Sequence, residues 1–370
     1  MPLDTEALRR RILQARSEAG LTQAELAAGG GLDRSAIAKI ETGTRGVSAL
    51  ELARLSQALG QRVEWLLEDG PPAVVSHRVR RGIDASVAQI DRELERLARD
   101  VDFVAAHSAS LKLLSREPWP VPESASDAED LAQRIRAEVG LQKNAPAENL
   151  VELFATVGLL IFVSNLGAEG ADGGTVLLRE GGVSLVNSSS QLGRRRLTAT
   201  HELAHYLVAD EYAVDWRISE TANSARSEAL FDRFARAFLL PESGLTQYWE
   251  AVVDEGIRAA SVRTASRFRV DMATLARRLS ELDLVARGDA ERVRAVRTGQ
   301  ADILDFNLVV PFELEGAVLP PIYERAILSL YRGERISAER ALSLLRGKYQ
   351  VSDLPELPLP REDELWSILS

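Results

Sequence analysis

Apolar residues recur at helical spacing in five short segments at the start of the chain, and a turn or polar break ends each one. The segments are residues 6–20, 22–28, 35–41, 48–60 and 63–67. Thr22 opens the second segment, and Glu25 stands three residues later, as in a capping box. The stretch GGGLDRS at 29–35 is expected to form a loop. The pattern predicts a domain of five helices over residues 1–70.

A longer apolar series follows the prolines at 71–72. Steps of four and three residues separate its first seven members, and the eighth is back in phase: Ile83, Val87, Ile90, Leu94, Leu97, Val101, Val104 and Leu111. This heptad spacing predicts a long helix within residues 71–130. Two structures fit it, a parallel coiled coil that joins two chains or a helix packed on its own chain.

The middle of the chain mixes helical and strand-like periods after a linker rich in proline, serine and acid at 116–130. Helices are expected near 128–139, 146–157, 189–210 and 227–241, with strands at 159–165, 175–180 and 183–187. The last two strands form a hairpin around Gly181-Gly182. The strand VSLVN at 183–187 either fills the core or offers an edge to an extended peptide.

The last eighty residues give a weaker pattern. Strand-like apolar runs with prolines precede two amphipathic helices, which Arg332-Gly333-Glu334 separates. The pair is either a partner-binding appendix or a lid packed on the rest of the chain. The sequence therefore predicts an α+β, mostly helical fold with a small antiparallel sheet, divided into residues 1–70, 71–130, 131–290 and 291–370.

Composition limits the possible functions. The 370 residues carry a net charge of −10, so a field that attracts nucleic acid to the whole chain is not expected. The chain has no cysteine, which excludes disulfides and thiolate metal sites and favours the cytoplasm. No apolar run reaches the length of a membrane span, and the charged N-terminus does not resemble a signal peptide.

The candidate chemistry lies in the stretch TATHELAHYL at 198–207. It holds two of the four histidines in the chain, His201 and His205, with Glu202 between them. Histidines at i and i+4 leave one face of a helix and can bind a single zinc ion. Glu202 can take a proton from a water molecule that the metal activates and pass it to a leaving amine. Chance would supply this His-Glu-x-x-His pattern about 0.006 times in such a chain.

A zinc site of this kind needs a third protein ligand and an open position. His77 and His107 lie in the linker and heptad segment, so another residue type is required. The helix at 227–241 offers Glu228 and Asp232 at i and i+4, on one polar face. An acid at Asp232 either orients a histidine ligand or lies on the surface.

The first seventy residues resemble the helix-turn-helix domain of the Xre (lambda repressor-like) family. The matching stretches are GLTQAELA at 20–27, DRSAIAKIETG at 33–43 and LARLSQALG at 52–60. The resemblance implies that Gln23 binds backbone phosphate, and that Arg34, Ser35 and Lys39 enter the major groove. Thr44 and Arg45 would then lie near phosphate. Since such domains usually bind DNA in pairs, a homodimer through residues 83–111 is the favoured form of the heptad helix.

Residues 140–285 resemble the ImmA/IrrE metallopeptidases. The resemblance rests on three stretches, GGTVLLREGGVSLVNSSSQLGRRRLTATHELAHYL at 173–207, EALFDRFARAFLLP at 228–241 and SVRTASRFRVDMATLARRLSELDLV at 261–285. It implies a zincin-like domain in which His201, His205 and Glu228 bind zinc, as in gluzincins, and Glu202 is the catalytic acid/base. Asp232 stands where the family often has asparagine, and would support a ligand from behind.

Together the two resemblances imply a regulatory zinc endopeptidase. Its expected substrate is a transcriptional repressor encoded nearby, whose cleavage turns on stress, DNA-damage or mobile-element genes. The alternative is a DNA-binding regulator or antitoxin whose peptidase-like domain senses a ligand or partner and cuts nothing. Tyr206, Tyr212 or an arginine would stabilise the oxyanion, and the sequence does not choose among them. No membrane partner is expected.

Overall fold

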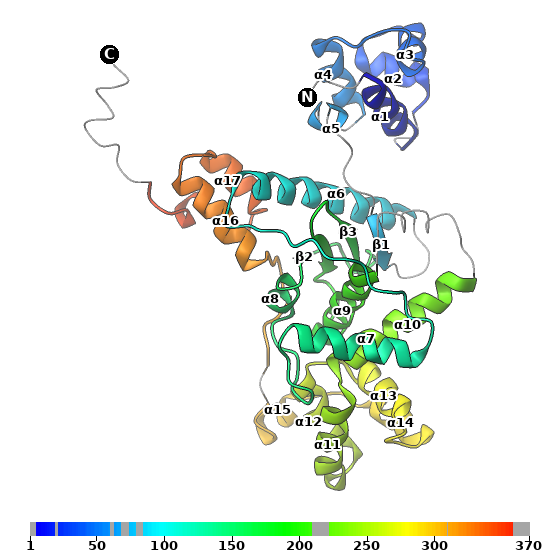
Figure 1. Ribbon diagram of the computed structural model, residues 1–370, viewed down its shortest axis with the longest axis vertical. Coiled ribbons are helices and arrows are strands. Elements are labelled where there is room, and N and C mark those ends of the chain that lie inside the picture. Colours follow the sequence, from blue (N-terminus) through cyan, green and yellow to red (C-terminus); the bar gives the residue numbers. More distant parts are fainter. Residues whose placement is uncertain are drawn as a thin grey trace. The chain divides into compact units, whose positions relative to one another are not determined.

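The computed structural model describes residues 5–18, 21–59, 63–67, 74–78, 84–208, 222–308 and 310–357, and it divides into two units, 1–71 and 72–370 (Figure 1). The first unit holds α1 (Thr5–Glu18), α2 (Gln23–Gly30), α3 (Arg34–Glu41), α4 (Ala49–Ala58) and α5 (Val63–Leu67). None of the helices within these described ranges is long and apolar enough to cross a bilayer. The fold is α+β and mostly helical, as predicted.

The second unit contains the sheet. Its strands are β1 (Val74–Arg78), β2 (Leu159–Ser164), β3 (Gly173–Leu177) and β4 (Gly182–Asn187). Its α-helices are α6 (Asp84–His107), α7 (Ala125–Glu138), α8 (Leu150–Ala155), α9 (Leu192–Val208), α10 (Ala222–Leu239), α11 (Glu242–Val252), α12 (Ile257–Phe268), α13 (Met272–Glu281), α14 (Arg287–Ala295), α15 (Gln300–Asp305), α16 (Pro321–Arg332) and α17 (Ala338–Leu344). The described residues of this unit also form the short 3₁₀ turns η2 (Val253–Glu255) and η3 (Val351–Asp353).

The first unit is a five-helix domain around one small apolar core. The capping box at the start of α2 is confirmed, because the Glu25 amide donates to the Thr22 hydroxyl and the Thr22 amide donates to the Glu25 carboxylate. The loop expected at 29–35 is shorter than predicted, because Gly29 and Gly30 continue α2 and Arg34 and Ser35 begin α3. A Cβ at Gly30 would lie 2.8 Å from a methyl carbon of Leu55 in α4. The glycines let α2 approach α4 closely, and Gly31 ends the helix with a positive φ.

The sheet of the second unit is mixed rather than antiparallel, with strand order β1-β3-β4-β2. The predicted hairpin of β3 and β4 is present, but β2 runs parallel to β4. Strands β2 and β3 are consecutive in the chain and run in opposite directions, but they do not pair with each other. Strand β4 lies between them in the sheet. Since β4 pairs on both sides, VSLVN is a core strand and offers no edge to a peptide. Strand β1, which the hydrophobic pattern does not predict, pairs antiparallel with β3.

The heptad helix α6 lies on one face of this sheet and α9 lies on the other (Figure 1). The residues of the apolar series whose burial is described are all buried: Ile90, Leu94, Leu97, Val101, Val104 and Leu111. They pack with Phe162, Val183 and Leu185 of the sheet. The packing supports the second alternative, a helix on its own domain. A coiled coil between two chains through residues 83–111 would need the same apolar side chains. The expected homodimer through this helix is therefore not supported, because these side chains are already buried against the sheet.

The C-terminal helical pair belongs to the same layer. Buried residues of α16 and α17, among them Tyr323, Ile327 and Leu344, share a core cluster with α6 and the sheet. Just before this pair, Val318 forms an antiparallel bridge with Val163 on the outer side of β2. The pair therefore packs on the sheet, as in the lid alternative.

Truncation of the α6 seam should weaken the fold. Leu97 is fully buried, so we expect Leu97→Ala to lower the free energy of unfolding by about 2–5 kcal/mol. Chemical denaturation measures this loss, and sedimentation should give the same mass for both proteins. A halved mass at unchanged stability would instead support the coiled coil.

Candidate functional site

The candidate site is built on α9, the helix between the sheet and helices α7 and α10. Every residue of α9 from Arg196 to Val208 is buried. Gly173 of β3 lets the helix approach, because a Cβ there would lie 2.6 Å from the Thr198 methyl carbon. His201, Glu202 and His205 are consequently only 2%, 0% and 4% exposed. Burying three polar side chains is costly unless each has a partner.

Two carboxylates of α10 approach the two imidazoles. The Glu228 carboxylate oxygens lie 3.1 Å from His201 Nε2 and 3.3 Å from His205 Nε2, and the two Nε2 atoms are 3.1 Å apart. Asp232, one turn further along α10, accepts a hydrogen bond from His201 Nδ1 at 2.9 Å. The structure thus brings together all five site residues expected in the peptidase domain, with Glu202 on the same turn as His201.

The three donors fit a tetrahedral metal. Zinc bonds of about 2.0–2.1 Å imply ligand separations of about 3.3–3.4 Å in a tetrahedron. The observed 3.1–3.3 Å separations are close to these values. Within the described residues, this is the cluster of three or more potential ligands whose donor atoms converge. The Glu228 side chain is 45% exposed, so the site opens to solvent on one side.

The environment keeps Glu228 in the form that a metal requires. Burial by itself would raise the pKa of this carboxyl. Hydrogen bonds and charge from His201 and His205 outweigh burial, and the pKa lies well below its ordinary value. Glu228 is therefore ionised at neutral pH.

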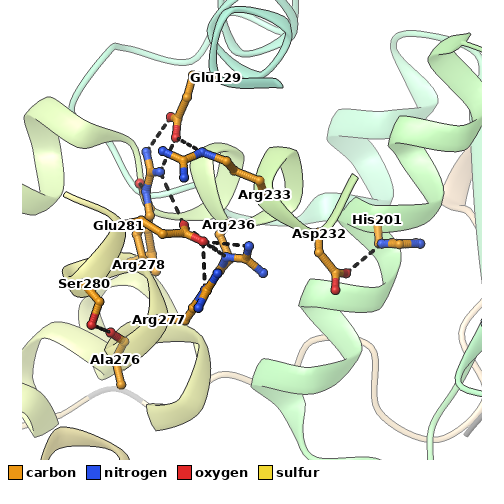
Figure 2. A network of polar contacts seen from close by, with 11 residues as sticks. Glu129, His201, Asp232, Arg233, Arg236, Ala276, Arg277, Arg278, Ser280 and Glu281 are labelled. Atoms are coloured by element: carbon orange, nitrogen blue, oxygen red, sulfur yellow. Dashed lines mark hydrogen bonds and ion pairs between the residues drawn. The ribbon is translucent and has the colours of Figure 1, made fainter. Parts of the chain in front are cut away.

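A network of ion pairs fixes α10, which carries Glu228 and Asp232 (Figure 2). Four arginines share two glutamates: Arg233 and Arg278 bind Glu129 of α7, and Arg236 and Arg277 bind Glu281 of α13. Arg278 is fully buried and also donates to the Leu240 carbonyl at 3.0 Å. These contacts hold α7, α10 and α13 together, so the carboxylates opposite α9 are preorganised.

Glu202 has a partner that the sequence did not indicate. The Thr175 hydroxyl of β3 donates to Glu202 Oε2 at 2.8 Å and lies 3.1 Å from the Ser184 hydroxyl of β4. Ser184 in turn donates to the Gly174 carbonyl at 3.1 Å. Both hydroxyl residues are fully buried. A polar residue inside each of two apolar strands was the available signal, but only the fold shows that both lie behind α9.

Tyr206, one of the residues expected to stabilise the oxyanion, has its hydrogen-bond partner elsewhere. The Tyr206 hydroxyl donates to the Val157 carbonyl at 3.1 Å, and burial raises the pKa of this phenol to about 12. Tyr206 is thus engaged in the core rather than with the candidate site. Tyr212 lies outside the described residues.

The first unit places most of its expected DNA contacts on the surface. Arg34, Ser35 and Lys39 are exposed on α3, and Thr44 is exposed just beyond it. Arg45 pairs with Glu51. The Gln23 amide donates to Glu41 at 2.7 Å, and the buried Glu41 also binds Arg16. Gln23 and Arg45 could therefore contact phosphate only through N–H groups that are not already bound to Glu41 or Glu51.

Similarity to known proteins agrees with both parts of the chain. The family description "Helix-turn-helix" matches residues 12–66, and "IrrE N-terminal-like domain" matches residues 156–280. A solved structure of a Mycobacterium tuberculosis transcriptional regulator is 20% identical, with a TM-score of 0.31 over 50% of this chain and 51% of that chain. No curated protein matches the sequence. Residues 12–66 are therefore similar to helix-turn-helix domains, and residues 156–280 are similar to the IrrE N-terminal-like domain.

Proposed function

We propose that this chain is a regulatory zinc endopeptidase that cuts a transcriptional repressor, and that its helix-turn-helix domain binds DNA. The observation that carries the proposal is the convergence of His201, His205 and Glu228 within 3.1–3.3 Å, next to the buried carboxylate of Glu202. A domain that only senses a partner has no need for that acid. The repressor is expected to be encoded by a neighbouring gene. The protein is expected in the cytoplasm, where both DNA and repressor are found.

In this proposal the residues have separate tasks. His201, His205 and Glu228 would hold zinc, which when bound supplies a Lewis acid for the scissile carbonyl and an activated water. Glu202 takes the proton of the attacking water and donates it to the leaving amine. Asp232 holds His201 through Nδ1, so that Nε2 points to Glu228 and His205. Thr175 holds one oxygen of Glu202 and thereby orients the carboxylate.

The direct test is cleavage of the repressor encoded beside the gene. The full chain should cut it at one site, found by mass spectrometry of the fragments. A chelator should stop the reaction, and added zinc should restore it. If the chain holds zinc but leaves every neighbouring repressor intact, the alternative function as a non-cleaving regulator or antitoxin is supported instead.

DNA binding by the first unit is tested with labelled duplex and single-stranded DNA at several salt concentrations. Nine basic and ten acidic side chains in residues 1–70 give little net attraction, so binding depends on the exposed residues of α3. Duplex binding that weakens as salt rises supports the proposal. Equal affinity for single strands would contradict reading of the major groove.

Removal of the carboxylate behind His201 should weaken metal binding. We expect Asp232→Ala to lower zinc affinity about 10–100-fold, because the imidazole loses the bond that fixes its tautomer and orientation. Asp232→Asn should lose less, since its amide oxygen can still accept from Nδ1. Competition with a zinc-binding dye measures both variants, and equal affinities for Asp232→Ala and the unmodified chain would contradict this role.

Removal of the hydroxyl at Thr175 should slow catalysis without loss of substrate binding. A hydrogen bond to a charged group contributes about 1.5–3 kcal/mol, so Thr175→Val should lower kcat about 10–100-fold with KM unchanged. Thr175→Ser should recover most of the rate. The control is Thr264→Val in α12, a buried threonine whose hydroxyl has no hydrogen-bond partner in the described structure. Equal rates for Thr175→Val and this control would rule out a positioning role.

A further inference from the structure

A cavity of about 1050 Å³ opens beside the candidate metal centre. Its walls are the start of α9, parts of α10, α12 and α13, and the chain from Arg294 to Pro311. Asp232, the partner of His201, is one of its lining residues. The cavity is large enough for several residues of an extended peptide.

The lining of this cavity, called here the arginine groove, is basic. Its charged residues are Arg194, Arg236, Arg269, Arg277, Arg294 and Arg297, against Asp232 and Asp271. Both aspartates are engaged, since Asp232 accepts from His201 and Asp271 accepts from the Thr274 amide at the start of α13. The whole chain carries a net charge of −10, so this surface has the opposite sign to the average.

Arg194 and Arg277 are the outer members of their ion pairs, whereas Arg269 pairs with the exposed Glu148 and the largely buried Glu313. Arg194 is 36% exposed while its partner Asp172 is 4% exposed. Arg277 is 68% exposed while Glu281 is 5% exposed, and Glu281 serves Arg236 as well. The guanidinium groups of Arg194 and Arg277 therefore face the cavity, and the acids that they pair with lie behind them.

Positive charge also exceeds negative charge around the groove. In the network of Figure 2, four arginines share two glutamates. Arg294 and Arg297 are exposed, and no carboxylate of the described residues pairs with either. Planar guanidinium groups with free donors bind carboxylates in a bidentate manner.

The remaining lining favours a peptide over a nucleic acid. Leu197, Met272, Val296, Ile303, Leu308 and Val310 contribute aliphatic surface, and no aromatic side chain stands among the described lining residues. Proteins that bind single strands stack bases on aromatic rings. Next to the groove, Leu304, Val310 and Phe312 are 78%, 53% and 86% exposed, an apolar surface open to a partner.

We propose that the arginine groove binds a segment of the protein substrate that carries acidic and aliphatic side chains, and that it thereby selects the substrate. This inference rests on the proposed function, because the groove adjoins the residues assigned to cleavage. A positive surface on a negative protein guides such a segment to the site and repels basic ones.

Fluorescence anisotropy tests binding without cleavage, in the full chain carrying Glu202→Gln. The probes are a fluorescein-labelled 16-residue peptide that alternates Glu or Asp with Leu, the same peptide with Lys for each acid, and a single-stranded oligonucleotide of equal charge. The acidic peptide alone should bind in the groove. Added Arg294→Glu and Arg297→Glu should raise its Kd about tenfold or more. The matched control is Arg287→Glu with Arg292→Glu in helix α14, which also carries Arg294. It changes charge equally outside the lining and should leave Kd within about twofold.

Three results would overturn the inference. They are no binding of the acidic peptide, an equal effect of the two double variants, or an oligonucleotide whose affinity depends on Arg294 and Arg297. In the cleavage assay, Arg294→Glu with Arg297→Glu should raise KM and leave kcat unchanged. If the Arg294→Glu, Arg297→Glu variant cuts the repressor with an unchanged KM, only the role of the groove is refuted. If the unmodified chain binds the acidic peptide but cuts no repressor, only the proposed peptidase function is refuted.

Discussion

Glu202→Gln is expected to abolish cleavage while the fold and the metal content stay intact. The amide cannot accept the proton of the attacking water, and general acid–base catalysis of this kind contributes about 10²–10⁴-fold to the rate. Glutamine has nearly the same shape, and its amide oxygen can still accept from the Thr175 hydroxyl. Glu202 is also absent from the set of converging metal donors, so zinc should remain. Single-turnover cleavage of the repressor measures the rate.

Two measurements separate a catalytic effect from damage to the fold. Metal analysis should find about one zinc per chain in Glu202→Gln, as in the unmodified protein. The thermal unfolding midpoints should also agree. The control is Glu242→Gln, an exposed glutamate in the first turn of α11, which should cut at the normal rate. A Glu202→Gln chain that cuts as fast as this control would exclude Glu202 as the acid/base.

His205→Ala is expected to remove the metal altogether. His205 Nε2 lies 3.1 Å from His201 Nε2 and 3.3 Å from Glu228, so the substitution deletes one of three donors from a site with few others. Zinc per chain, measured after dialysis, should fall from about one to near zero. Without zinc the peptidase activity should disappear as well.

Linkage between binding and folding gives a second measurement. A metal present at a thousand times its Kd stabilises a folded protein by about 4 kcal/mol. Added zinc should therefore raise the unfolding midpoint of the unmodified chain and leave that of His205→Ala unchanged. The matched control is His107→Ala, which alters an exposed histidine at the end of α6. Full zinc content in His205→Ala would place the metal elsewhere.

The chemistry of the candidate site could be anticipated because most of it is local. His201, Glu202 and His205 lie within five residues, and the helical repeat alone puts the two imidazoles on one face. The sequence pattern alone did not show whether Glu228 or Asp232 is the third metal ligand, because both lie on one polar face of the helix. The family resemblance was needed to choose Glu228. The structure separates them by distance: Glu228 approaches both Nε2 atoms, and Asp232 reaches the other ring nitrogen of His201.

What the sequence left open depends on contacts between distant segments. A seven-residue apolar repeat is the same whether a helix packs on a second helix or on a sheet, so the environment of Leu97 could not be read from it. The edge or interior position of VSLVN depends on where β2 pairs, about twenty residues earlier. The bond from Thr175 to Glu202 joins residues 27 positions apart. Side-chain type at a position does not encode such partners.

The layer formed by α6, α16 and α17 limits how the domain that holds the candidate site can be transplanted. The family match spans residues 156–280, yet the side chains that cover one face of its sheet come from residues before 112 and after 318. A fragment cut to the match would expose Phe162, Leu185 and their neighbours to water and would tend to aggregate. A gene fusion that keeps this domain folded must therefore carry flanking sequence from both sides, because both flanks share one core with the sheet.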